Sequence, residues 1–340
     1  MLNDELAPLI VPMKRKVQTG SAAFFMFLIP FGGPLCFLLA IYMLFYTRLW
    51  WVCFLYLSWV FIMDRNVEER GGRSIEWIRG WLVWKHFRDY FPARLNRAPW
   101  VDLKPEKNYL LCCFPHGIIS AGSFSAFGST YGEFDVYFPK HSVRVCTLKQ
   151  NFYMPLFREL ILGLGGCSAS ETSIDYLLGS PKGGNAVVLM PGGVAESYYC
   201  EPRKYKLVLK NRKGFIRMAM KNGSPLVPVF SFGETDIFDQ YGGKESKLKE
   251  YQEFVRKVVG IAPIISIGRG IFQYRFGMVP HRRPITMLVG PPIDVMKNGS
   301  PTAEEVDEIH ARFIHELCNL FEANKHFYLN KCEDIHIEII

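Results

Sequence analysis

The stretch Tyr109-Leu110-Leu111-Cys112-Cys113-Phe114-Pro115-His116-Gly117 decides the fold, because an apolar run ends there in a proline, a histidine and a glycine. Short apolar runs bounded by such residues are typical of buried strands. Ligands and catalytic groups of α/β sheets gather beyond the carboxyl ends of strands, so His116 stands where a catalytic residue would stand. A lone histidine is more often structural, and this feature alone leaves the two roles equally open.

Beyond this stretch, short apolar runs alternate with helical stretches, which predicts an α/β domain. The predicted strands are Tyr109–Phe114, Val143–Leu148, Ala186–Met190, Leu226–Phe230 and Ile285–Val289. The predicted helices are Met154–Gly163, Lys213–Asn222, Leu248–Val259 and Thr302–Asn324. Ser300-Pro301 supplies an N-cap and a proline at the first position of the last helix.

The N-terminal part of the chain is apolar enough to enter a membrane. Between Lys16 and Arg48 lie 31 uncharged residues, and between Arg48 and Asp64 lie 15. The first run exceeds the roughly 20 residues that span a bilayer, and the second falls short of it. Pro30 and Pro34, with two glycines between them, predict either a kinked span or two short helices.

Basic residues flank this pair of runs, and only Arg48 lies between them. They are Lys14, Arg15 and Lys16 on one side and Arg65, Arg70, Arg73 and Arg79 on the other. By the positive-inside rule both ends face the cytosol, which predicts a helical hairpin embedded in the membrane. A cleaved signal peptide is disfavoured because the run is too long, and a buried helix pair is disfavoured by its unbroken length.

The next segment, Ser74–Phe91, is predicted to form one helix with Trp77, Trp81 and Trp84 on a single side. Such a stripe lies in the lipid headgroup layer or packs in the core. We therefore divide the chain into a cytosolic N-terminal segment (residues 1–16), a membrane hairpin (17–63), an interfacial helical segment (64–108) and an α/β domain (109–340).

Composition and absent motifs argue against several classes of protein. Nine cysteines without metal-ligand spacing indicate a reduced, cytosol-facing domain and no metal site. The chain lacks G-x-S-x-G, Walker A and H-E-x-x-H motifs, which removes the main support for hydrolase, nucleotide hydrolase and zinc protease functions. Nucleic acid is not an expected partner of a membrane-anchored chain without a nucleic-acid motif.

A series of short motifs runs in order through the chain. They are Gly71-Gly72-Arg73-Ser74, Phe87–Pro92, Pro115-His116-Gly117, Arg158-Glu159, Asp175–Leu178, Gly192–Ser197, Asn211–Phe215, Val227–Glu234 and Gly268-Arg269-Gly270. With the hairpin, they resemble the type-2 diacylglycerol acyltransferase family, which also holds monoacylglycerol acyltransferases and wax-ester synthases. The resemblance implies a glycerol-acyltransferase-like mixed sheet flanked by helices. It also implies an O-acyltransferase that uses acyl-CoA as co-substrate, without a cofactor.

The chain departs from this family at Phe114, where most animal and fungal members carry a first histidine. We take His116 as the base, because it directly precedes the glycine that lets substrate and backbone approach closely. The departure therefore bears on the identity of the acceptor more than on the chemistry.

The reaction requires an alcohol to attack a thioester carbonyl. A neutral His116 assists by accepting the hydroxyl proton, a contribution of about a hundred- to ten-thousand-fold. Related glycerol acyltransferases orient the histidine with a nearby aspartate, but Ser120 and Ala121 occupy the corresponding positions. Glu196, which follows a predicted strand, is our candidate for this task, and a solvent-facing acid at a helix N-terminus is the alternative.

The other predicted site residues bind substrate. Pro115 and Gly117 flank the base, and the Gly192-Gly193 backbone offers N–H groups to the developing oxyanion.

The phosphates of coenzyme A need cations. Arg212 and Lys213, in the basic stretch from Arg203 to Lys213, are the residues expected to bind them. Arg269 is a further expected substrate-binding residue. A solvated basic face and attraction to anionic lipid are the alternatives for that stretch.

The predicted function is conversion of diacylglycerol to triacylglycerol at the endoplasmic reticulum membrane or a lipid droplet, with the catalytic domain in the cytosol. Monoacylglycerol and fatty alcohol are alternative acceptors. A non-catalytic hairpin protein that coats lipid is the alternative from another class, and the retained base, acid and cations argue against it. Membrane lipid is an expected partner, and self-association into a homo-oligomer stays open.

Overall fold

A seven-stranded sheet forms the centre of the protein in a computed structural model that describes residues 11–240, 266–271 and 276–340. The strand order is β1-β10-β7-β2-β5-β3-β4, and every adjacent pair is parallel except β10 with β7. The strands are β1 (Arg94–Arg97), β2 (Tyr109–Phe114), β3 (Ser142–Thr147), β4 (Gly166–Ser168), β5 (Asn185–Leu189), β7 (Leu226–Phe232) and β10 (Thr286–Val289). The predicted mixed α/β sheet is confirmed.

All five predicted strands are confirmed, with ends that differ by no more than two residues from the prediction. The two strands of this sheet that the sequence did not predict are β1 and β4. Strand β1 contains a single apolar residue, Leu95, and β4 is only three residues long and begins with a glycine. Neither therefore presents the apolar run or the alternation that signals a strand.

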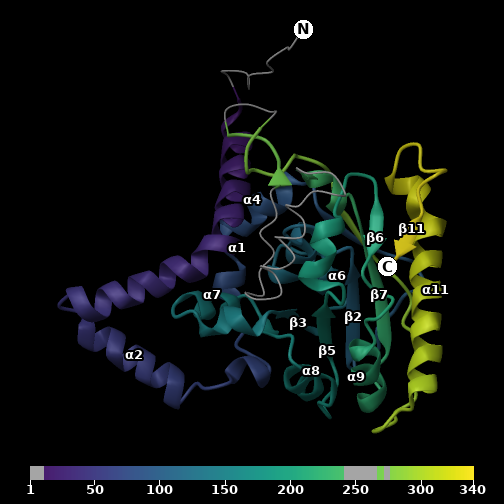
Figure 1. Cartoon of the computed structure of the whole chain (residues 1–340), viewed down its shortest axis with the longest axis horizontal. Coiled ribbons are helices and arrows are strands. Elements are labelled where there is room, and N and C mark those ends of the chain that lie inside the picture. Colours follow the sequence, from purple (N-terminus) through teal and green to yellow (C-terminus); the bar gives the residue numbers. More distant parts are fainter. Residues whose placement is uncertain (1–10, 241–265, 272–275) are drawn as a thin grey trace, which may run out of the picture.

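The pleat of β2 directs alternate side chains into two cores, one on each face of the sheet. Leu110, Cys112 and Phe114 pack with helices α8 (Glu171–Leu178), α9 (Gly214–Asn222) and α11 (Ala303–Tyr328). Leu111 and Cys113 pack with residues of η2 (Phe124–Gly128) and α6 (Phe134–Tyr137). Figure 1 shows α11 along one flank of the sheet domain.

Several short elements complete the sheet domain. They are η1 (Val67–Glu69), α5 (Ala121–Ser123), η3 (Lys149–Tyr153), α7 (Phe157–Gly163), η4 (Gly193–Tyr199) and η5 (Glu234–Ile237). Two small sheets pair β6 (Tyr205–Leu207) with β11 (Ile337–Ile339), and β8 (Asp239–Gln240) with β9 (Ser266–Ile267).

Three of the four predicted helices are confirmed, and the fourth, Leu248–Val259, lies outside the described residues. The first begins three residues later than predicted, as α7, because Leu156 has a φ of 63° and is not helical. The N-cap of α11 is Thr302, and the prediction of Ser300 was wrong. Thr302 Oγ1 accepts the N–H of Glu305 at 3.2 Å, and the Glu305 carboxylate accepts the Thr302 N–H at 2.8 Å. This reciprocal capping box satisfies two helix-terminal donors.

The segment predicted as one helix with a tryptophan stripe forms two helices, α3 (Glu76–Arg79) and α4 (Leu82–Tyr90). The break falls at Gly80, so the three tryptophans do not share one helical face. Trp84 is buried in the core, whereas Trp77 is 72% exposed. The core role therefore holds for Trp84 and not for Trp77.

The long apolar N-terminal run forms a single helix, α1 (Met13–Tyr46), that contains Pro30 and Pro34. Figure 1 shows a sharp bend in the middle of this helix, as expected where proline removes a backbone hydrogen bond. A kinked helix is thus the correct alternative. Helix α2 (Trp50–Ile62) follows, and the outer half of α1 and α2 form a V that projects on the flank opposite α11 (Figure 1). In the described part of the chain, α1 alone is long and apolar enough to cross a bilayer.

A closed ring of four charged side chains joins the end of α2 to α7. Arg73 contacts Asp64 at 2.9 Å and Glu159 at 2.5 Å, and Arg158 contacts the same two carboxylates at 2.9 and 2.7 Å. Tyr56 of α2 donates its hydroxyl to Glu159 at 3.2 Å. The four charges sum to zero, so the ring ties the helix pair to the sheet domain without a net buried charge.

Candidate active site

His116 lies in a turn at the carboxyl edge of the sheet, directly after β2. Strands β5 and β7 are the two neighbours of β2 and run parallel to it. The chain after β5 brings Glu196 to this edge, and the chain after β7 brings Glu234 there. The segments after three adjacent strands thus bring together the half-buried His116 and two buried acids. Glu196 is 2% exposed and Glu234 is 1% exposed.

The hydrogen bonds of the His116 ring determine which nitrogen can act as a base. Nδ1 lies 2.9 Å from the carbonyl oxygen of Gly117 and 3.1 Å from Ser197 Oγ. Because a carbonyl oxygen only accepts, we assign the proton to Nδ1 and the free lone pair to Nε2. Burial lowers the pKa of His116 below its usual range, although the hydrogen bond to Gly117 opposes this shift. The ring is therefore neutral at pH 7.

Ser197 supports this arrangement, and sequence reasoning gave it no role. Its hydroxyl donates to the Gly117 carbonyl oxygen at 2.5 Å, and its oxygen lies 3.1 Å from Nδ1, where it can accept the ring proton. The only sequence signal for Ser197 was its place next to Glu196 in the same short motif.

Glu196 lies beside His116 as predicted, but it contacts the backbone and not the ring. Its Oε2 accepts the N–H of His116 at 2.6 Å, and its Oε1 accepts the N–H of Val208 at 3.0 Å. The role expected for Glu196 is corrected accordingly: it holds the start of the turn, whereas Gly117 and Ser197 hold the tautomer. Burial raises the pKa of Glu196 to about 7, opposed by the two backbone N–H groups and Arg212.

Glu234 is a second buried acid at this edge, and sequence reasoning left it without a function. Its carboxylate accepts the N–H groups of Ala121 and Gly122, both at 2.8 Å. Burial raises the pKa of Glu234 to about 7, opposed by those two bonds and by the hydroxyl of Ser231. Both Glu196 and Glu234 come shortly after an apolar strand and a glycine. This shared pattern was the sequence signal that could have identified Glu234.

The Gly192-Gly193 pair makes room and closes a turn. A Cβ at Gly192 would lie 2.5 Å from Glu196 Oε1, so glycine is needed for the carboxylate to fit. The N–H of Gly193 donates to the Met190 carbonyl at 3.0 Å and is already engaged. The prediction that Gly193 donates to an oxyanion is therefore wrong for this structure.

Much of the predicted basic cluster is paired within the protein. Lys213 pairs with Asp307, Lys206 with Glu338, and Lys204 with Glu201, while Arg203 donates to two backbone carbonyls. Arg212 is exposed and forms no ion pair with any residue that the structure describes. Its charge lowers the pKa of Glu196, which places it near the His116 turn. Arg212 is thus better placed than Lys213 to meet a phosphate.

The remaining predicted residues fall in two places. Pro115 and Gly117 lie on either side of His116, and Gly117 has a φ of 64°, which favours glycine. Arg269 lies in a separate loop, where its Nε donates to the Gly270 carbonyl at 3.1 Å.

Phe114 is fully buried and packs away from the turn. Its side chain belongs to the core between the sheet and α11, with its ring centroid 6.1 Å from that of Phe313. This position therefore serves packing.

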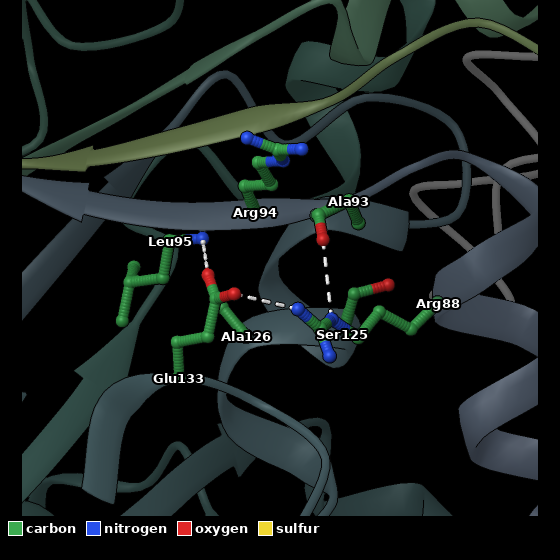
Figure 2. A pocket seen from close by; sticks show the side chains of 8 residues that line it. Arg88, Ala93, Arg94, Leu95, Ser125, Ala126 and Glu133 are labelled. Carbon is green, nitrogen blue, oxygen red and sulfur yellow. Dashed lines mark hydrogen bonds and ion pairs between the residues drawn. The ribbon is translucent and has the colours of Figure 1, made fainter. Parts of the chain in front are cut away.

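A small cavity lies next to Gly122, in the segment that follows the His116 turn. Arg88, Arg94, Leu95, Gly122 and Glu133 contribute to its lining (Figure 2). The Glu133 carboxylate accepts the Leu95 N–H at 2.8 Å and pairs with Arg88 at 2.6 Å. His116 does not line this cavity.

Comparisons with known proteins show that the chain is an O-acyltransferase. The family described as "Diacylglycerol acyltransferase" matches residues 42–338, and the chain belongs to that family.

Individual relatives in this family differ in acceptor. "2-acylglycerol O-acyltransferase 1" of Bos taurus is 38% identical over 95% of this chain and 96% of its own length. "Diacylglycerol O-acyltransferase 2" of Danio rerio is 42% identical over 90% of this chain and 84% of its length. "Acyl-CoA wax alcohol acyltransferase 2" of Homo sapiens is 36% identical over 97% of this chain and 100% of its length.

A solved 1-acyl-sn-glycerophosphate acyltransferase, PlsC of Thermotoga maritima, aligns with 90% of this chain and 97% of its own chain. Its sequence identity is 14% and its TM-score is 0.38, a similarity too low to support an argument.

Proposed function

We propose that this chain transfers a fatty acyl group from acyl-coenzyme A to the free hydroxyl of diacylglycerol, with His116 Nε2 as the general base. The observation that supports this most directly is the bond from Nδ1 to the Gly117 carbonyl, which leaves Nε2 as the acceptor on a neutral ring. Nε2 takes the hydroxyl proton as the acceptor oxygen attacks the thioester carbonyl. The tetrahedral intermediate then expels the thiolate of coenzyme A, which takes the proton from the imidazolium.

The donor brings its own activation, because a thioester carbonyl is already electrophilic, and the reaction needs no cofactor. Arg212, exposed and near Glu196, is the cation that we assign to a coenzyme A phosphate. Lys213 and Arg269 complete the proposed phosphate contacts, Lys213 by exchanging its partner Asp307 for phosphate.

The acceptor is tested by assaying membranes that contain the protein with labelled oleoyl-coenzyme A and each acceptor in turn. Diacylglycerol is our first choice because the Danio rerio diacylglycerol relative has the higher identity, 42%. Monoacylglycerol is the second candidate, because the 2-acylglycerol relative matches a larger share of the chain, 95%. Absence of transfer to diacylglycerol, monoacylglycerol and fatty alcohol alike would contradict the enzyme and favour a lipid-coating protein.

The apolar surface of the helix pair supports insertion into the membrane of the endoplasmic reticulum. Phe45 and Ile62 are 71% and 74% exposed, and Trp50 near the tip is 54% exposed. The 13 residues of α2 cover only about 20 Å, less than a hydrocarbon core of about 30 Å. A shallow hairpin also fits the single leaflet of a lipid droplet, with lipid as the partner of this surface.

The flanking cations support a cytosolic position for both termini and for the catalytic domain. Protease treatment of sealed microsomes should therefore remove an N-terminal tag and a C-terminal tag alike. Protection of either tag would contradict this orientation. Crosslinking in the same microsomes tests whether the chain forms a homo-oligomer.

A further inference from the structure

Glu234 occupies a position that links the two ends of the catalytic turn. It is 1% exposed and lies at the start of η5, directly after β7. Its Oε1 accepts the Ala121 N–H and its Oε2 accepts the Gly122 N–H, both at 2.8 Å. Ser231 adds a hydroxyl donor at 3.3 Å. All three bonds are donated to the carboxylate, as its ionised form requires.

The two backbone donors belong to the residues that end the turn. Ala121 and Gly122 open α5, and the first N–H groups of a helix have no partner within it. They directly follow Ser120, whose hydroxyl donates to the His116 carbonyl at 2.9 Å. A carboxylate that fixes these two amides therefore fixes Ser120 and, through it, the backbone of His116.

Two glycines let Glu234 sit this close to the turn. A Cβ at Gly117 would lie 2.6 Å from Glu234 Cγ. A Cβ at Gly122 would lie 2.8 Å from Glu234 Oε2 and 2.6 Å from Ser231 Oγ. The turn thus closes on the carboxylate from both sides, and neither position has room for a larger residue.

We infer that Glu234 is a positioning residue for acyl transfer, which holds the turn from His116 to Gly122 in the shape that presents Nε2 to the acceptor. It acts on the backbone of the turn from just beyond the neighbouring strand β7, whereas Gly117 and Ser197 contact the imidazole itself. Glu196 holds the start of the turn at the His116 N–H, and Glu234 holds its end. This inference rests on the proposed role of His116 as the base.

Glu133 provides a matched control, because it is a second glutamate that accepts a backbone N–H close by. Figure 2 shows its carboxylate between Leu95 and Arg88, in the cavity that Gly122 also lines. It anchors β1 and has no bond to the catalytic turn. The substitution Glu133→Gln therefore makes the same chemical change without loosening the turn.

The test compares Glu234→Gln with Glu133→Gln in membranes. An amide retains one acceptor oxygen, so Glu234→Gln loses at least one of the three charge-assisted bonds, and kcat should fall about ten- to hundredfold. KM for oleoyl-coenzyme A should stay within about twofold, since the contact to the donor is unchanged. Backbone hydrogen exchange in the peptide that covers residues 115–123 should be faster in Glu234→Gln and unchanged in Glu133→Gln.

Gly122→Ala is a second variant, which disturbs the hydrogen bond between Gly122 and Glu234 by a change at the donor residue and not at the carboxylate. Alanine favours an ordinary helix over glycine by about 1 kcal/mol. Here its Cβ would displace the Glu234 carboxylate, so kcat should fall about as far as in Glu234→Gln.

The outcomes separate this inference from the proposed function. Normal kcat in Glu234→Gln beside an inactive His116→Ala overturns the inference alone. An equal loss in Glu133→Gln, or a raised KM at unchanged kcat, overturns it as well. Normal turnover in His116→Ala overturns the proposed base instead, and hydrogen exchange, which does not depend on acyl transfer, still shows whether Glu234 holds the turn.

Discussion

Two clusters of acids, one buried and one partly buried, differ in what neutralises their charge. At the catalytic edge, Glu196 and Glu234 accept backbone N–H groups. Where α2 joins the sheet domain, Asp64 and Glu159 form ion pairs with Arg73 and Arg158 in a closed ring. Backbone donors place a carboxylate accurately but carry no charge to offset its burial, and the pKa values of Glu196 and Glu234 rise accordingly to about 7.

This difference assigns the two clusters different tasks. The acids of the catalytic edge shape a turn of a few residues around His116. The ring joins elements that are far apart in the sequence, since Asp64 follows α2 and Arg158 belongs to α7. Changes at the first cluster should therefore affect turnover, and changes at the second should affect stability.

The largest expected effect comes from removing the proposed base. His116→Ala should lower kcat by about a hundred- to ten-thousandfold, because Nε2 of this ring is the proposed acceptor of the hydroxyl proton. The variant should stay folded and membrane-bound, since the half-buried ring contributes little to either core. His315→Ala, on the exposed face of α11, is the control that keeps its activity. Near-normal turnover in His116→Ala would remove the proposed mechanism.

The second prediction concerns the ring. Arg158→Ala removes a buried cation and leaves the partly buried carboxylates of Asp64 and Glu159 with one arginine. Breaking a fully buried pair costs about 3–5 kcal/mol, which sets the upper limit of the expected loss. The thermal midpoint in detergent should fall strongly, while kcat per folded molecule stays close to that of the wild type. Arg312→Ala, at an exposed site on α11, should change stability by no more than about 0.5 kcal/mol. A loss of kcat per folded molecule in Arg158→Ala would contradict the division of tasks.

The sequence predicted the strands and the position of His116 because both depend on local patterns. Strand β2 ends where the apolar run ends, and the carboxyl edge of a parallel sheet follows from the α/β class. It did not predict what binds the imidazole, because Gly117 and Ser197 meet only after β2 and β5 pair. Strands and helices are visible as a periodic pattern of apolar residues, but no such pattern indicates which residues will form a long-range polar contact.

The same limit applies to the ring and to the basic cluster. Arg158 and Asp64 are 94 residues apart, so their pairing depends on how α7 docks on the helix pair. Lys213 looked like a free cation because its partner, Asp307, comes from α11. Sequence reasoning counts charges, whereas the fold decides which of them are already paired.

The third prediction uses the raised pKa values. Burial raises the pKa of Glu196 from 4.5 to about 7, so the folded state binds this proton more tightly than the unfolded state. Stability therefore falls as the pH rises from about 4.5 to about 7, by roughly 3 kcal/mol for such a group. The free energy of unfolding of the wild type, compared with that of Glu196→Gln, should therefore fall by roughly 3 kcal/mol between about pH 4.5 and about pH 7.

Thermal midpoints of both proteins, measured in detergent at several pH values, check this prediction. Histidines that titrate in the same window do so in both proteins and cancel in the difference. Parallel curves would show that the carboxyl of Glu196 is not desolvated in solution, and would remove the contrast between the two acid clusters. The Glu234→Gln variant should repeat the result, because burial raises the pKa of that group equally, to about 7.

The smallest expected effect on turnover lies at Phe114, the position where the family resemblance is broken. The Phe114 side chain is fully buried in the core beneath α11, at the last residue of β2, and only Pro115 separates it from His116. A histidine there would bring a polar ring into an apolar site without a partner, at a cost of about 1–3 kcal/mol of stability. Phe114→His should therefore lower the thermal midpoint and change kcat per folded molecule by less than about threefold.

Phe114→Leu, which keeps the site apolar but leaves a smaller volume, is the matched control for packing and should also leave kcat intact. A rise of kcat by tenfold or more in Phe114→His alone would mean that a histidine before the proline takes part in catalysis, and that the turn held by Glu196 and Glu234 presents two bases and not one.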